Sequence, residues 1–121
     1  MKTLILGALF VSLLTVLPGA AQADAFERVE KKDSFVSLIK NRALTRLGIR
    51  LQVLEDGQIS GRAFGRKVTG DWNWKGGYFC RDLYVGGDEL GANCQMVQVR
   101  GNTIRFTSDR GAGEYADLRL K

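Results

Sequence analysis

The sequence predicts a mainly β protein, a small antiparallel meander barrel or sandwich of about seven strands with one short N-terminal helix. Apolar and polar residues alternate through most of the chain after Ala43, and glycine-containing turns interrupt the alternation at short intervals. Only one stretch has helical spacing. The predicted strands cover about residues 43–54, 58–64, 67–75, 78–85, 92–100, 103–108 and 114–120.

The first residues, 1–23, have the pattern of a secretory signal peptide. Lys2 is followed by an apolar run, and Ala21-Gln22-Ala23 forms an A-x-A cleavage site. An uncleaved N-terminal anchor is the alternative, although the run is short for a bilayer. We therefore expect a periplasmic protein whose mature part, residues 24–121, is a single disulfide-stapled β domain without a transmembrane segment.

The predicted helix lies in the stretch KKDSFVSLIKN. Asp33 or Ser34 is suited to cap its N-terminus, and Phe35, Leu38 and Ile39 share one face. We expect this amphipathic helix to plug the sheet or lean on it.

The strands that follow are predicted from their alternation and turns. The odd-numbered residues from Leu47 to Val53 are apolar, which places them on one face of one strand. Asp56-Gly57 is expected to form a two-residue hairpin turn with positive φ at both positions.

Two further glycine turns fix the register of their hairpins. A two-residue turn at Gly76-Gly77 places Trp72 opposite Arg81, and the equivalent turn at Gly101-Asn102 places apolar residues opposite apolar ones. The core face of the first hairpin is predicted to carry Trp72, Trp74, Phe79, Arg81, Leu83 and Val85.

The only two cysteines fall on the opposite face of this region. Cys80 and Cys94 meet across a hairpin centred on Gly87, with GGDEL as its polar tip, and an exported protein favours a disulfide between them. A redox pair is not expected, because redox cysteines form C-x-x-C motifs at helix N-termini. A zinc site is not expected either, because two cysteines without histidine do not complete a tetrahedral ligand set.

The formal charge of +5 allows two interpretations. The arginines are scattered, as on a solvated basic face; alternatively they meet an anionic partner such as lipopolysaccharide, phospholipid or an acidic protein. A nucleic-acid partner is not expected for an exported chain.

The absence of histidine excludes the histidine-dependent catalytic triads and a histidine general base. The carboxylate pairs Glu55-Asp56 and Asp88-Glu89 lie in predicted exposed turns, where their pKa values would not be separated for acid–base work. GRAFGR does not open a helix after a strand, so no dinucleotide site is predicted. We therefore predict no catalytic residue, no cofactor and no metal.

Several segments carry a resemblance to known proteins: LTRLGIRL, DGQISGRAFGRKVTGDWNW, GYFCRDL, NCQ and FTSDRGAGEYADLRL. With them the chain resembles short exported proteins of alphaproteobacteria that are often labelled dihydrodipicolinate reductase. That resemblance implies an NAD(P)H-dependent oxidoreductase. Gly70-Asp71-Trp72 followed by a cysteine-bearing strand is also similar to small secreted β proteins of the lipocalin-like kind, which implies barrel character.

Two classes of function follow. The first is a non-enzymatic periplasmic binding protein, a monomer that takes a small amphipathic ligand in the barrel mouth or contacts a protein or envelope surface. Its candidate pocket is Trp72, Trp74 and Arg81, where a guanidinium opposite an indole offers cationic and aromatic contacts. In the alternative interpretation of these residues the tryptophans are core and Arg81 stacks on Trp72. The second class of function is the reductase.

Overall fold

The computed structural model describes Gly7, residues 11–14 and residues 25–121. The predicted signal peptide, residues 1–23, lies outside the described residues except for Gly7 and 11–14. Within the described part of the chain, no helix is both long and apolar enough to cross a membrane.

The chain between Glu27 and Leu120 forms one α-helix, nine strands and a short 3-10 turn in the described region. All strand pairs are antiparallel. In chain order the elements are β1 (Glu27–Val29), α1 (Lys32–Ile39), β2 (Leu44–Arg46), β3 (Ile49–Val53), β4 (Gln58–Ala63), β5 (Arg66–Lys75), β6 (Tyr78–Val85), β7 (Asp88–Arg100), β8 (Thr103–Thr107), η2 (Asp109–Gly111) and β9 (Tyr115–Leu120).

The sheet closes on itself. Its strand order is β1-β7-β6-β5-β4-β3-β2-β9-β8, and an additional pairing of β7 with β8 joins strands β2 to β9 into a ring of eight. The long strand β7 makes this possible, because its first half pairs with β6 and its second half pairs with β8 on one edge and with β1 on the other. The prediction of a mainly β, meander-type barrel with one short helix is confirmed.

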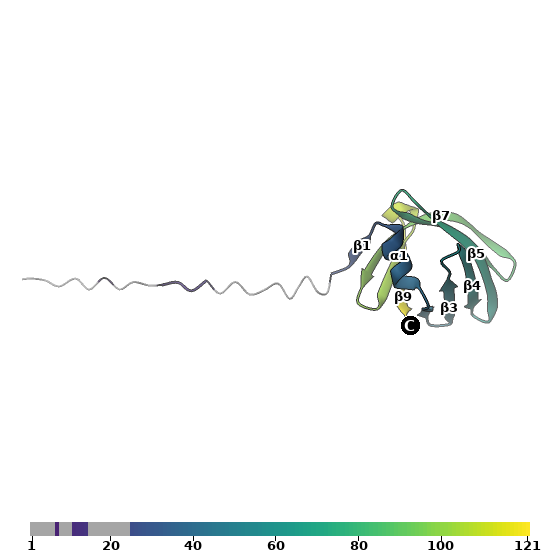
Figure 1. Cartoon of the computed structure of the whole chain (residues 1–121). Helices are drawn as coiled ribbons and strands as arrows, with labels where there is room; N and C mark the ends of the chain where they lie inside the picture. The colour runs from purple at the N-terminus through teal and green to yellow at the C-terminus, as the bar shows by residue number, and fades with distance from the viewer. Residues whose placement is uncertain (1–6, 8–10, 15–24) are drawn as a thin grey trace, which may run out of the picture.

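Helix α1 packs into one end of this barrel, and the strands curve around it (Figure 1). Phe35 is fully buried, and its ring centroid lies 5.3 Å from that of Trp72, 5.0 Å from Trp74 and 5.1 Å from Phe79. An isolated helix of eight residues is not stable in water, so packing holds α1 in place. The predicted capping residues were wrong: Lys31 is the N-cap, and it makes no side-chain capping bond.

The register predicted for the central hairpins is confirmed. Trp72 pairs with Arg81 across β5 and β6, and Cys80 pairs directly with Cys94 across β6 and β7. The Cys80–Cys94 disulfide is formed. The pairing of Val97 with Phe106 across β7 and β8 is confirmed as well.

The predicted strand 43–54 was wrong, because the chain turns within it. Leu47-Gly48 connects β2 to β3, with Gly48 at a φ of +76°. A two-residue turn shifts the alternation, so Arg46 takes an inward position and Leu47 is 93% exposed rather than on the core face.

Two predicted turns also differ in length. The β3–β4 connection spans four residues, 54–57, and only Gly57 among them has positive φ, so the two-residue turn at Asp56-Gly57 was wrong. At GGDEL only Gly86-Gly87 form the turn, and β7 begins at Asp88 rather than at residue 92.

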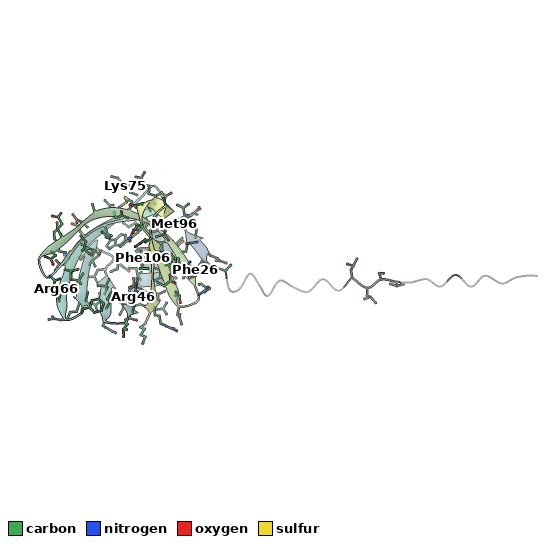
Figure 2. The ribbon with its side chains drawn as sticks, turned by 180° about the vertical axis from the view of Figure 1, so that it is seen from behind. Phe26, Arg46, Arg66, Lys75, Met96 and Phe106 are labelled. Carbon is green, nitrogen blue, oxygen red and sulfur yellow. A yellow bond between two sulfur atoms is a disulfide. The ribbon has the colours of Figure 1, made fainter. Side chains whose placement is uncertain are left out.

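The two ends of the barrel are different. Successive hairpin turns alternate between the ends, so those after β3, β5 and β7 share one end, and those after β2, β4 and β6 share the other. The first is the helix end, where the Trp74 indole N–H donates to the Glu30 carbonyl just before α1. The second we name the open end. Figure 2 shows Lys75, beside the β5–β6 turn, on the opposite side of the barrel from Arg46 and Arg66.

Candidate ligand-binding site

A cavity of about 290 Å³ lies inside the barrel between α1 and the open end. Its lining comes from every strand of the ring except β5. Most of the lining side chains are aliphatic or aromatic, among them Ile49, Leu51, Leu83, Leu90, Phe106 and Leu118. An eight-stranded barrel has room inside for packed side chains or one small ligand, and here the half near α1 is filled while the half near the open end is not.

Two arginines bring charge into this apolar space. Arg46 projects from β2 and Arg81 from β6, and these strands are four apart in either direction around the ring of eight. The two guanidinium groups therefore enter the cavity from opposite walls. No carboxylate from the described part of the chain lines the cavity.

Arg81 is half-buried and held toward the open end. Its Nη1 donates a hydrogen bond of 2.6 Å to the carbonyl oxygen of Gly91 on β7. Burial lowers the pKa of the Arg81 guanidinium, and the nearby Asp82 carboxylate partly offsets that effect. The group stays protonated at neutral pH, because arginine has a very high intrinsic pKa.

Neither cavity arginine forms an ion pair with a carboxylate of the described residues, although Asp82 is near enough to Arg81, and Asp117 to Arg46, for a weaker electrostatic interaction. The ion pairs found there involve other arginines and Lys40, and neither Arg46 nor Arg81 takes part in one. Gln95 is the remaining polar residue of the lining, and its Nε2 donates to the Ser108 hydroxyl at 3.3 Å. Apart from its bond to Gly91, the donor capacity of Arg81 is open to a ligand.

The structure brings Trp72 and Arg81 of the predicted pocket together as cross-strand partners, but the three residues do not share one cavity. Trp72 is 6% exposed, and its indole N–H donates to the Leu54 carbonyl at 2.8 Å. Trp74 is half-buried at the same helix end. Of the three, only Arg81 lines the interior cavity.

The alternative interpretation is correct in placing the tryptophans in the core, since Trp72 is buried there and Trp74 packs against it. Stacking of Arg81 on Trp72 is not observed, and Lys32 is the cation found over the Trp72 ring, at 5.8 Å. Trp72 and Arg81 also border a second, more open hollow of about 550 Å³ beside the disulfide, together with Asp82 and Asn93. A ligand role for the three predicted residues stays a prediction.

Arg46 was missed by the sequence analysis. Uninterrupted alternation from residue 43 to residue 54 places Arg46 on the solvent face, and the turn at Leu47-Gly48 reverses that assignment. The signal that could have revealed it is Gly48, a glycine in the middle of an apolar alternation.

No protein-family model, no curated protein and no solved structure matches this chain. The chemistry of the cavity therefore has to be inferred from its own residues.

Proposed function

We propose that this protein is a non-enzymatic, periplasmic binding protein that takes a small amphipathic molecule into the barrel through its open end. The observation that carries the proposal is the cavity itself, an apolar space entered by two guanidinium groups and lined by no carboxylate in the described region. Ligand sites in proteins are mostly apolar concave spaces with a few convergent polar groups. The volume of about 290 Å³ suits one short chain or a single ring system.

Charge favours an anionic head group on this ligand. A half-buried cation without a carboxylate partner has lost part of its hydration without gaining an ion pair. An anion placed beside Arg81 restores that interaction through charge-assisted hydrogen bonds, which the planar guanidinium makes in pairs to a carboxylate or phosphate. The apolar body of the ligand would then contact Leu51, Leu83 and Phe106.

The periplasmic assignment rests on two features. The Cys80–Cys94 disulfide is typical of proteins that fold in an oxidising compartment. The leader pattern in residues 1–23 is that of an exported chain.

Calorimetric titration with decanoate and with decanol tests the proposal. We expect decanoate to bind and Arg81→Gln to weaken it by about 10- to 100-fold, because hydrogen bonds to charged groups contribute about 1.5–3 kcal/mol. Decanol, which lacks the charge, is expected to bind weakly and to be little affected by this substitution. Arg119→Gln is the matched control, because Arg119 is an exposed arginine on β9 outside the cavity lining.

The outcomes of the titration separate the alternatives. If neither amphiphile binds, the cavity is not a ligand site for this class and the proposal fails. If both bind and Arg81→Gln weakens both equally, the cavity accepts amphiphiles but the charge argument is wrong.

The reductase implied by the sequence resemblance is tested separately. NADPH oxidation in the presence of the dihydrodipicolinate-pathway substrate is followed with the purified protein, and a heat-inactivated sample is the control. Turnover above that control would favour the oxidoreductase over the binding protein.

A further inference from the structure

Two neighbouring hairpin tips at the open end expose apolar side chains to solvent. Leu47, in the β2–β3 turn, is 93% exposed, and Phe64, in the β4–β5 turn, is 74% exposed. The turns are adjacent, because the Phe64 backbone N–H donates to the Gly48 carbonyl at 2.7 Å. Neither exposed side chain is explained by packing of the core.

Phe64 is also in an unfavourable backbone conformation. It has a φ of +50° at the first position of the two-residue turn Phe64-Gly65. Asparagine and glycine are preferred at such a position, whereas a bulky side chain there is a steric outlier. The Phe64 ring packs over Gly48 of the neighbouring turn, but most of the side chain stays exposed. A strained phenylalanine that remains this exposed points to a role at the surface.

Cations surround these tips. Arg50 on β3 is directly opposite Arg62 on β4, and Arg62 is directly opposite Lys67 on β5. Like charges directly opposite each other on neighbouring strands destabilise a sheet. Among the described residues, no ion pair offsets this repulsion for any of the three cations. Such a row is stabilised when an anionic surface covers it.

We propose that this corner of the open end docks on an anionic phospholipid bilayer. We define the docking corner as Leu47, Arg50, Arg62, Phe64 and Lys67. Its two apolar side chains enter the head-group region, and its three cations contact lipid phosphates.

The pattern favours a lipid surface over a soluble polyanion, because cations alone would satisfy a polyanion and would leave the exposed apolar tips unexplained. The neighbouring Arg66 is held by Asp88 at 2.7 Å and is not counted among the three cations. The docking goes beyond the proposed ligand binding and does not depend on it. Docking would, however, bring the mouth of the cavity next to the membrane, because Arg46 and Ile49 of the cavity lining flank the turn that carries Leu47.

Co-sedimentation with lipid vesicles tests the proposal on the purified protein. We expect binding to vesicles of phosphatidylcholine with phosphatidylglycerol, little binding to phosphatidylcholine alone, and weaker binding as salt rises. The triple variant R50Q/R62Q/K67Q should bind about 100-fold more weakly, since each cation near an anionic bilayer contributes on the order of fivefold.

A matched charge control removes three cations elsewhere. Its substitutions are K31Q, K75Q and K121Q, at exposed positions outside the docking corner. This variant has the same net charge as the triple variant and should keep nearly all vesicle binding.

The apolar part of the docking corner has its own variants. Phe64→Asn places a residue that favours positive φ in the turn, so the hairpin is retained while vesicle binding falls. Phe64→Trp keeps an aromatic side chain and should keep the binding, because tryptophan is favoured at membrane interfaces.

Four results would overturn the docking proposal. They are equal binding to neutral and anionic vesicles, no binding to either, an equal loss in the two triple variants, and binding that is independent of Phe64 but competed by heparin, which would indicate a soluble polyanion instead.

Arg81→Gln distinguishes docking from ligand binding. If this variant loses vesicle binding while R50Q/R62Q/K67Q keeps it, lipid is entering the cavity, so the docking proposal fails and the proposed function stands. Docking predicts the reverse.

Discussion

Replacing Phe35 by alanine is expected to cost a large share of the stability of this domain. The side chain is fully buried, and its ring lies within 6.4 Å of four other aromatic rings, those of Trp72, Trp74, Phe79 and Phe106. Deleting a buried phenylalanine side chain costs about 3–5 kcal/mol, of which part comes from the space left behind. The walls here are a hydrogen-bonded ring of strands that collapses poorly, so we expect about 4–5 kcal/mol.

The loss should be cooperative, because α1 has little stability of its own. It has eight residues and no side-chain capping bond, so it depends on the burial of Phe35 and Ile39. Against a total stability of about 5–15 kcal/mol for a typical domain, Phe35→Ala is close to unfolding the protein. Phe35→Leu, which keeps most of the volume, should cost less than half as much.

Urea unfolding followed by tryptophan fluorescence measures these changes, since Trp72 and Trp74 both contact the substituted site. Ser34→Ala, on the exposed side of α1, is the control and should stay within about 0.5 kcal/mol of the wild type. A loss below about 1 kcal/mol for Phe35→Ala would refute the view that α1 plugs the barrel by burying this ring.

Three further predictions concern other parts of the barrel. Replacing both Cys80 and Cys94 by serine should lower the free energy of unfolding by about 3 kcal/mol in urea titrations, because their separation of 14 residues closes a loop that restricts the unfolded chain; an unchanged midpoint would contradict this. The hydrogen bond from Arg105 lowers the pKa of the Asp117 carboxyl, so its stabilisation is present above the unfolded pKa of about 3.9 and is lost as the pH falls through the folded value. Thermal unfolding of Asp117→Asn should therefore be less pH-dependent in acid, and an identical acid slope would count against the pairing. Gly61→Ala should cost more than about 2 kcal/mol, because Gly61 has a φ of +146° and a Cβ there collides with the backbone of β3; normal thermal stability of this variant would show that the strands can separate there.

The sequence predicted best those parts of the fold that local turn chemistry determines. Gly76-Gly77 left one possible two-residue turn, so the facing of Trp72 and Arg81 followed from counting. Counting from the turn at Gly86-Gly87 alone would place Cys80 opposite Asn93, and the register shift between Leu83 and Tyr84 brings it opposite Cys94 instead. Strand β1 was missed, because three residues that join the sheet only through the distant strand β7 carry no local signal.

The candidate site could be predicted only in part, for the same reason. Arg81 was identified because it interrupts an apolar face in a hairpin of known register. Arg46 was not, because its orientation depends on where the preceding strand turns, and Leu47-Gly48 has no strong turn signature. Whether Trp72 and Trp74 line an open pocket or a filled core depends on the docking of α1, whose Phe35 packs against both rings, and spacing along the sequence does not reveal that contact.

The unequal filling of the barrel explains why a cavity remains toward its open end. The large rings of Trp72 and Phe79 pack against Phe35 of α1, while the inward positions nearer the open end on β4 and β5 include Gly61 and Gly70. A side chain at Gly70 would meet the backbone at Asp82, so close strand packing excludes filling the space from that wall.

The same closeness of strands at the open end brings the β2–β3 and β4–β5 tips together, because the Phe64 N–H reaches the Gly48 carbonyl. Glycine on the inner wall near the open end therefore leaves the cavity unfilled from the side of β4 and β5. The cavity and the docking corner lie next to each other at the open end, because Arg46 and Ile49 of the cavity lining flank the turn that carries Leu47. A small anionic amphiphile released from a membrane would meet Arg46 at the mouth before it reaches Arg81 inside.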